Sequence, residues 1–234
     1  MHRSIPRINP VILGNGLLGQ ELFKQTGWDI LSRSVNNVDL TDITTWAHLL
    51  LPYNTVINCI AFTDTYSDDK QSNWDVNYKA VIELTDYCNY HQKKLIHIST
   101  DYIYSNSLSE ASEEDVPAHN NTWYSYTKLL GDAYVQVKSK NYLICRESHK
   151  PYPFPYPQAW DDVKTNGDLV PKIAQLIIKL IKNNAEGVFN VGTEVKTIFD
   201  MASEFNIGSI KSPSYIPKDT TMNISKLTNF LNNI

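Results

Sequence analysis

The segment YSYTK, residues 124–128, places a tyrosine and a lysine four positions apart. In a helix this spacing puts both side chains on one face, one turn from each other. A tyrosine can donate a proton to a carbonyl oxygen, although its ordinary pKa of about 10 makes it a weak acid. A nearby lysine charge lowers that pKa. Tyr124 and Lys128 are therefore candidates for the acid and its helper in a ketone reduction, and two ordinary helix-surface residues are the alternative.

A glycine-rich turn lies in the sequence VILGNGLLGQELF, residues 11–23. Gly14 permits a tight turn from strand to helix, Gly16 lets a pyrophosphate approach the backbone, and Gly19 lets the helix pack on the strand. The amides and the dipole of the helix would face the phosphates. The pattern predicts a dinucleotide site because it follows a predicted strand and opens a predicted helix. A turn without a ligand is the alternative.

The end of the second predicted strand indicates which dinucleotide binds. An acidic residue there would hold the ribose 2′-hydroxyl of NAD. The sequence has Ser32, Arg33 and Ser34 instead, and an arginine beside hydroxyl groups suits a 2′-phosphate. NADP(H) is therefore the predicted cofactor, while NAD(H) and a merely solvated Arg33 are the alternatives.

Short apolar segments rich in β-branched residues alternate with helical patterns. The predicted strands cover residues 10–13, 28–32, 55–61, 94–100, 142–146 and 187–192. The predicted helices cover residues 17–25, 43–50, 72–92, 125–138 and 168–182. Strands that are apolar on both faces suit a parallel sheet between helix layers. The alternation predicts an α/β fold with a Rossmann-type, doubly wound parallel sheet.

Two stretches interrupt this alternation. Residues 149–167 contain four prolines and several aromatic residues, which excludes a helix or a central strand and predicts an adherent loop. Residues 104–121 are acidic and polar, which predicts a surface loop. The acidic runs at residues 113–115 and 161–162 are expected to be solvated rather than metal-binding.

Composition excludes several classes of function. The net charge of −4 leaves no basic surplus for nucleic acid. No apolar run is long enough to cross a bilayer, and residues 1–13 lack the apolar core of a signal peptide, so we expect a cytoplasmic protein with no membrane partner. Three cysteines and scattered histidines indicate neither a disulfide framework nor a metal site. Cys59 and Cys145 are expected to be buried.

Eight motifs occur in a consistent order along most of the chain. They are GNGLLG (14–19), DLTD (39–42), VINCIAFTD (56–64), DVN (75–77), ISTDYIYS (98–105), YSYTK (124–128), ICRES (144–148) and TMNISKL (221–227). Together they resemble the extended short-chain dehydrogenase/reductases, and within them the dTDP-4-dehydrorhamnose reductase-like group of nucleotide-sugar reductases. The resemblance implies an NADPH-dependent oxidoreductase of dTDP-rhamnose-type biosynthesis. Its substrate would be a nucleotide-linked 4-keto-6-deoxy sugar, with Tyr124 donating a proton as hydride reaches the C4 ketone.

The resemblance also implies roles for matching residues. The catalytic set would be Thr100, Asp101, Tyr124 and Lys128, with Thr100 orienting the carbonyl. Asp39 and Leu40 would border the adenine, and Asn77 would be a structural polar residue. The implied cofactor contacts are Gly14, Asn15, Gly16, Leu17, Leu18, Gly19, Ser32, Arg33, Ser34, Asp39, Leu40, Cys59, Ala61, Phe62, Thr63, Ser99, Tyr124 and Lys128.

The chain departs from the family pattern after ICRES. The pattern has a segment similar to Trp/Val-Tyr-Gly, a helix and a further strand there, but residues 149–167 intervene. We expect residues 1–147, with 183–196 returning to the sheet, to form a dinucleotide-binding Rossmann domain. Residues 148–182 and 197–234 would form a small, truncated C-terminal substrate lobe. The aromatic residues Tyr152, Phe154, Tyr156 and Trp160 would either stack on a base or sugar or seal this lobe.

The truncated lobe leaves other functions open. A non-catalytic NADP-binding regulatory or partner subunit would resemble the methionine adenosyltransferase β-subunit, although the joint presence of Thr100, Tyr124 and Lys128 favours an enzyme. A related epimerase or dehydratase would share the Tyr–Lys pair, but a dehydratase would have Glu in place of Tyr102 after Asp101. The resemblance also implies a possible homodimer, formed through the predicted helices at residues 72–92 and 125–138.

Overall fold

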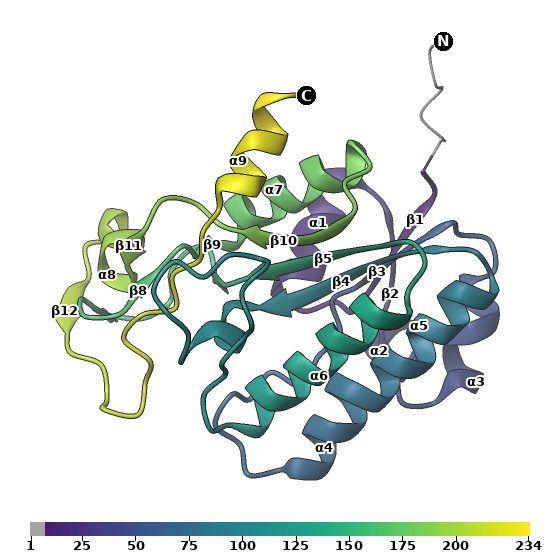
Figure 1. The fold of residues 1–234 in the computed structure, drawn as a ribbon, viewed down its shortest axis with the longest axis horizontal. Coiled ribbons are helices and arrows are strands. Elements are labelled where there is room, and N and C mark those ends of the chain that lie inside the picture. Colours follow the sequence, from purple (N-terminus) through teal and green to yellow (C-terminus); the bar gives the residue numbers. More distant parts are fainter. Residues whose placement is uncertain (1–7) are drawn as a thin grey trace.

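The computed structural model describes residues 8–234, and its centre is a six-stranded parallel sheet (Figure 1). The strand order is β10-β5-β4-β3-β1-β2. The strands are β1 (Pro10–Leu13), β2 (Asp29–Leu31), β3 (Thr55–Asn58), β4 (Lys94–Thr100), β5 (Tyr142–Glu147) and β10 (Gly187–Val191). The chain runs from β1 to β2 on one side and then to β3 on the other side of β1, so β1 and β3 flank a topological switch point. The predicted α/β fold is confirmed.

Helices cover both faces of the sheet (Figure 1). Ile12 and Ile57 belong to the core formed with α1 and α7, whereas Val11 and Val56 belong to the core formed with α3, α5 and α6. Alternate residues of a strand face opposite sides, so both faces must be apolar. The longer helices are α1 (Leu17–Thr26), α5 (Ala80–Tyr90), α6 (Trp123–Lys138), α7 (Val170–Lys182) and α9 (Ser225–Asn232), and α3 (Ile43–Trp46) is short.

The predicted helix over residues 72–92 is interrupted. It consists of α4 (Lys70–Trp74), the π-helical turn η2 (Asp75–Lys79) and α5. The buried Asn77 side chain accepts a hydrogen bond from Phe62 N at 2.9 Å and donates one to Phe62 O at 3.0 Å. Gly131 allows α6 to approach, because a Cβ there would lie 2.5 Å from Asn77 O. Asn77 thus fixes the loop after β3 relative to α6.

The stretch 149–167, expected to be a loop, contains three short strands. They are β6 (His149–Lys150), β7 (Gln158–Trp160) and β8 (Lys164–Thr165). Each pairs with a strand later in the chain, namely β9 (Asp168–Leu169), β12 (Gly208–Ile210) and β11 (Lys196–Thr197) respectively. The expectation was wrong because two- and three-residue strands held by distant partners carry no periodicity of their own.

Aromatic side chains close the small core of this C-terminal part. Phe154 is buried and stacks on Phe205, with ring centroids 6.5 Å apart, and Tyr152 contacts the edge of the same ring. Trp160 packs against the same cluster. The remaining elements here are α8 (Ile198–Met201) and η4 (Ser203–Phe205). These aromatic residues seal the C-terminal part of the molecule.

The predicted surface loop 104–121 is anchored rather than free. Tyr104 and Ala111 are buried, and Ala111 forms a β-bridge with Met222. Glu113, expected to be solvated, accepts a hydrogen bond from Asn190 N of β10 at 2.8 Å. The C-terminal segment therefore lies against this loop. The contact is not visible in the sequence, because its partners are far apart along the chain.

The acidic residues Asp161 and Asp162 form ion pairs at the surface. Their partners are Lys211 and Lys218, at 2.7 and 3.0 Å respectively. Within residues 8–234, no group of three or more histidine, cysteine or acidic residues could hold a metal ion. No helix in this described part is long and apolar enough to span a membrane. The expectation about residues 1–13 falls largely outside the described range.

A buried ion pair joins α6 to β5. Arg146 Nε and Nη2 each donate a hydrogen bond of 3.0 Å to the Asp132 carboxylate, and both side chains are fully buried. The Tyr104 hydroxyl contacts the same guanidinium. Removing one partner of a buried pair leaves an uncompensated charge.

Asp132→Asn is therefore expected to lower the free energy of unfolding by about 3–5 kcal/mol. Asp75→Asn is the matched control, because Asp75 pairs with Lys79 at the surface at 3.1 Å and should cost less than about 1 kcal/mol. Urea unfolding followed by circular dichroism measures both. Equal costs for the two variants would contradict the structural role of the Arg146–Asp132 pair.

Candidate functional site

A pocket lies at the carboxyl ends of the strands, over the switch point between β1 and β3. Open α/β sheets bind ligands at this position. The glycine turn forms one part of its wall, and the end of β2 and the loop after β3 form a second. The end of β4 with α6 forms a third, and the end of β5 with β6 forms a fourth. The pocket thus brings together residues from most of the motifs found in the sequence.

The glycine turn has the shape that a pyrophosphate requires. Gly14 adopts a φ of +99°, and a Cβ at Gly19 would lie 2.0 Å from Gly14 O, so the start of α1 sits directly on the end of β1. A Cβ at Gly16 would meet no atom within 4 Å. No side chain caps the N-terminus of α1, so its amides and dipole are available to an anion. Backbone and open space therefore fit a dinucleotide phosphate.

The residues after β2 contact one another as well as the pocket. Arg33 Nη2 donates a hydrogen bond to Asp39 Oδ2 at 2.7 Å, although the Arg33 side chain is largely exposed. Burial opposes the shift, but hydrogen bonds from Thr41 and Arg33 hold the pKa of Asp39 below its ordinary value. Arg33 is therefore paired rather than merely solvated. Of the predicted residues here, Ser34 does not line the pocket; its hydroxyl accepts a hydrogen bond from Asn15 Nδ2 at 2.8 Å.

The loop after β3 supplies the middle of the wall. Cys59, Ala61, Phe62 and Thr63 line the pocket as predicted. Burial raises the pKa of the Cys59 thiol, so this cysteine stays protonated at neutral pH and is not a nucleophile. All three cysteines are free, and Cys88 and Cys145 are buried.

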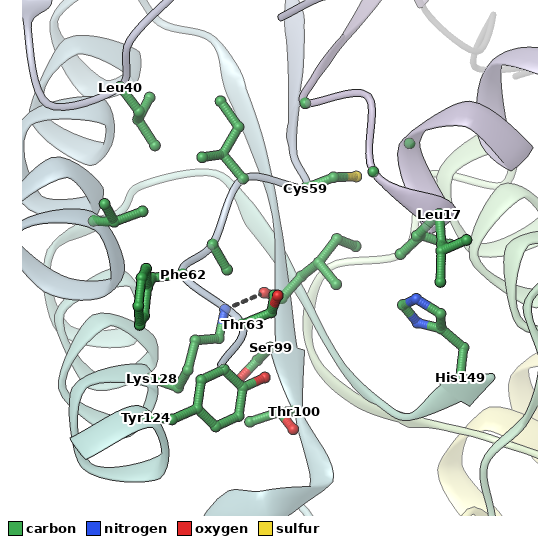
Figure 2. A pocket seen from close by; sticks show the side chains of 18 of the residues that line it. Leu17, Leu40, Cys59, Phe62, Thr63, Ser99, Thr100, Tyr124, Lys128 and His149 are labelled. Atoms are coloured by element: carbon green, nitrogen blue, oxygen red, sulfur yellow. Dashed lines mark hydrogen bonds between the residues drawn. The ribbon is translucent and has the colours of Figure 1, made fainter. Parts of the chain in front are cut away.

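Thr100, Tyr124 and Lys128 gather on one side of the pocket (Figure 2). Thr100 is the last residue of β4, and its hydroxyl donates to Asp101 Oδ1 at 3.3 Å. Lys128, one turn beyond Tyr124 in α6, donates a hydrogen bond to Ile98 O at 2.7 Å. Helix α6 begins at a Thr122 cap, which fixes the turn that carries Tyr124.

Burial sets the protonation of these groups. It lowers the pKa of Lys128 to about 8, although the charges of Asp132 and Glu147 act in the opposite direction. Burial raises the pKa of Tyr124, although a hydrogen bond with Thr100 opposes this. Burial also raises the pKa of Asp101 to about 6. At neutral pH the pocket therefore holds a protonated tyrosine beside a charged lysine, which suits proton donation.

A buried serine hydroxyl also lies in the wall of the pocket. Ser99 Oγ is buried at the pocket wall and has no hydrogen-bond partner among the described residues, so a ligand atom can satisfy it. Asp39, Leu40 and Ile60 also line the pocket. All predicted site residues except Ser34 therefore meet at one pocket.

Sequence reasoning missed the far wall of the pocket. Glu147, Ser148, His149 and Lys150 line it, as does Tyr102 beside Thr100. The available signal was the position of Glu147 and Ser148 at the carboxyl end of a predicted strand, where ligands bind. The prolines and aromatic residues of 149–167 conceal this signal, because they indicate a loop rather than the strand β6.

The strand order and the pocket over the switch point define a Rossmann-type α/β protein. The chain belongs to the family described as RmlD substrate binding domain, which matches residues 11–149. The resemblance to dTDP-4-dehydrorhamnose reductase-like proteins is thereby confirmed.

Relatives match mainly the N-terminal part. The chain is 27% identical over 144 residues to the spore coat polysaccharide biosynthesis protein SpsK of Bacillus subtilis, which covers 57% of this chain and 50% of the relative. It is 31% identical over 134 residues to dTDP-4-dehydrorhamnose reductase of Mycobacterium tuberculosis, covering 52% and 43% respectively. The match therefore spans about half or less of the length of these relatives.

The fold extends further than the sequence match. The structure of dTDP-4-dehydrorhamnose reductase from Bacillus anthracis in complex with NADP superposes with a TM-score of 0.81 at 20% identity. The superposition covers 97% of this chain and 93% of that one. The C-terminal part therefore shares the overall fold of this protein.

Gly16→Ala should mainly weaken NADPH binding, whereas Gly19→Ala should mainly lower the stability of the fold. Gly16 has a φ of −68° and open space at its Cβ position, so Gly16→Ala should change stability by less than about 0.5 kcal/mol while weakening NADPH binding by roughly tenfold or more. Gly19→Ala should destabilise the fold by about 1–3 kcal/mol. Calorimetric titration with NADPH and urea unfolding measure the two effects. Unchanged NADPH binding by Gly16→Ala would argue against a pyrophosphate at this turn.

Proposed function

We propose that the protein is an NADPH-dependent reductase of a nucleotide-linked 4-keto-6-deoxy sugar, with Tyr124 as the proton donor. The observation that carries this proposal is the presence of Thr100, Tyr124 and Lys128 on one wall of a pocket that begins at the glycine turn. The names of the relatives, dTDP-4-dehydrorhamnose reductase among them, support the choice of substrate class. The B. anthracis structure with NADP supports the choice of cofactor.

Different residues of the pocket would bind different parts of the cofactor. The turn from Gly14 to Gly19 would hold the pyrophosphate, and Lys128 would hold the nicotinamide ribose. Asp39 and Leu40 would border the adenine, and Arg33 would meet a 2′-phosphate. Because Arg33 already neutralises Asp39 at 2.7 Å, that carboxylate repels a 2′-phosphate less than a free one would. This favours NADP(H), with NAD(H) as the alternative.

The protein residues handle the proton. NADPH, when bound, supplies the hydride for the ketone. Tyr124 holds a proton at its hydroxyl, because burial raises its pKa, and gives it to the oxygen of the ketone as negative charge develops there. The Lys128 charge stabilises the tyrosinate that remains. The Thr100 hydroxyl orients the ketone oxygen, and Asp101 orients that hydroxyl through the 3.3 Å hydrogen bond.

The C-terminal part would supply the substrate lobe. We infer a dinucleotide-binding domain of residues 1–147 with 183–196, and a reduced substrate lobe of residues 148–182 and 197–234. Helix α7, which falls in the second group, packs on α1 and the sheet, so only the segments around it would contact substrate. None of the four aromatic residues Tyr152, Phe154, Tyr156 and Trp160 lines the pocket. Phe154 and Trp160 belong to the apolar cluster of the lobe, and Tyr152 and Tyr156 are exposed.

Tyr124→Phe tests the reaction directly. The variant should oxidise NADPH about 10²–10⁴-fold more slowly, with unchanged NADPH affinity, because only the donor hydroxyl is lost. The substrate is a dTDP-4-keto-6-deoxy sugar formed in situ by a dehydratase and an epimerase, and absorbance at the nicotinamide band reports turnover. Tyr126→Phe on the exposed side of α6 is the control. NADPH binding without turnover in the parent protein would indicate a non-catalytic NADP-binding partner subunit instead.

The pH dependence follows from Lys128. Burial lowers its pKa to about 8, so the ammonium is present below this pH and is lost above it. We expect kcat/KM for the ketone to fall as the pH rises through about 8, because the neutral amine no longer stabilises the tyrosinate. Lys128→Gln should remove this descending limb, whereas Lys138→Gln at the exposed end of α6 should keep it. The same limb in Lys128→Gln would assign it to another group.

A further inference from the structure

Four consecutive residues, 147–150, line the pocket and have no role in the proposed reduction. Glu147 is the last residue of β5, and His149 and Lys150 form β6. Figure 2 shows His149 beside Leu17, across the pocket from Tyr124 and Lys128. Pairing of β6 with β9 holds this segment in place, with His149 opposite Asp168 and Lys150 opposite Leu169.

His149 and Glu147 form an ion pair that leaves one imidazole nitrogen for a ligand. His149 Nδ1 lies 3.0 and 3.1 Å from the two carboxylate oxygens of Glu147. The Glu147 side chain is 5% exposed, whereas that of His149 is 23% exposed and lines the pocket. A buried carboxylate needs a charged partner, so Nδ1 carries a proton. The free nitrogen, Nε2, is then also a donor when the ring is charged.

Lys150 is a second donor without a protein acceptor. Its side chain lines the same wall. Within residues 8–234 its ammonium has no hydrogen-bond or ion-pair partner, although the charges of Asp101 and Glu147 act on it over a longer distance. Burial lowers the pKa of Lys150. A cation that is partly buried in a pocket and lacks a direct partner gains most from an anionic ligand.

When His149 is protonated, this part of the pocket holds more cations than anions. Burial would lower the pKa of His149, but the Glu147 carboxylate raises it above the ordinary value. Asp168, opposite in β9, is engaged elsewhere, because Lys196 and Lys172 bind its carboxylate at 2.7 and 3.3 Å. The groups that face His149 from the surrounding elements are Glu147 on β5, Asp101 on η3 (Asp101–Tyr104), Lys150 on β6, and Tyr124 and Lys128 on α6.

We propose that His149 and Lys150 bind an oxyanion of the nucleotide-linked sugar, either a carboxylate on the sugar or its diphosphate, and that Glu147 positions His149 for this contact. When His149 is protonated, both side chains offer only donors to the pocket, so they favour a ligand group that offers only acceptors. The proposal rests on the proposed function only in placing a nucleotide-linked sugar in this pocket. A contact with a sugar carboxylate would make residues 147–150 a selector of the sugar, and a contact with the diphosphate would make them an anchor for the nucleotide.

Matched probes distinguish the two sources of the oxyanion. The probes are a nucleoside diphosphate, its neutral hexose conjugate and its hexuronate conjugate, each in the dTDP and UDP forms, titrated calorimetrically into the parent protein. Preference for the hexuronate over the hexose would identify a sugar carboxylate. It would also replace the 6-deoxy sugar of the proposed function with a hexuronate, because a 6-deoxy sugar carries a methyl group at C6. Equal binding of all three, with the effects of the variants below, would identify the diphosphate.

His149→Gln and Lys150→Met should each weaken the favoured probe by roughly tenfold, the usual effect of losing one charge-assisted hydrogen bond. Neither should change NADPH affinity. Binding by the parent protein should weaken as the pH rises and His149 loses its proton, and this pH dependence should vanish in His149→Gln. His48→Gln is the control, because His48 is exposed and lies outside the pocket.

Glu147→Gln tests the positioning role separately. It keeps the shape of the side chain but removes the charge, so the imidazole resonances of His149 should titrate at a lower pH in the nuclear magnetic resonance spectrum. Unchanged titration would overturn the role of Glu147. Three outcomes would overturn the oxyanion site. Probe binding could be insensitive to both His149→Gln and Lys150→Met, or no probe could bind. In the third outcome, the two variants would weaken NADPH binding alone. Turnover of the keto sugar with NADPH is measured separately, so it can succeed or fail independently.

Discussion

Strand β5 ends in two adjacent buried charges that face opposite sides of the sheet, and the arrangement of the site depends on them. Arg146 binds Asp132 through two hydrogen bonds of 3.0 Å and so fixes α6, the helix that carries Tyr124 and Lys128. Glu147, the next residue, faces the pocket and binds His149. Since successive strand residues point to opposite faces, one dipeptide positions both walls of the pocket.

The two anion sites that we propose in the pocket would bind negative charge by different means. At the glycine turn, backbone amides and the uncapped N-terminus of α1 are available because Gly14, Gly16 and Gly19 keep side chains away. At residues 149 and 150, the side chains of His149 and Lys150 lie near the carboxylates of Glu147 and Asp101. Backbone donors are fixed in place and suit a pyrophosphate, whereas the side-chain donors His149 and Lys150 would suit a group of the substrate.

The C-terminal part is stabilised by pairing between distant short segments. Three two-stranded sheets join residues 149–169 to one another and to residues 196–210, and the bridge from Ala111 to Met222 ties the end of the chain to the loop after β4. Phe154 and Phe205 supply a small apolar core. This part therefore holds β6, and with it His149 and Lys150, against the larger sheet.

The sequence by itself determined the central sheet, the glycine turn and the Tyr124–Lys128 pair, since each depends on local spacing: alternation in strands, a helical turn, or three glycines in six residues. The resemblance carried by the sequence motifs implied the proposed cofactor contacts, and all of them except Ser34 line the pocket. Only the tertiary structure decided the Arg33–Asp39 pair, the anchoring of Phe62 by Asn77, the short strands after β5 and the pairing of Glu147 with His149. These features depend on burial and on partners brought together by the completed fold, and neither leaves a periodic trace in the chain.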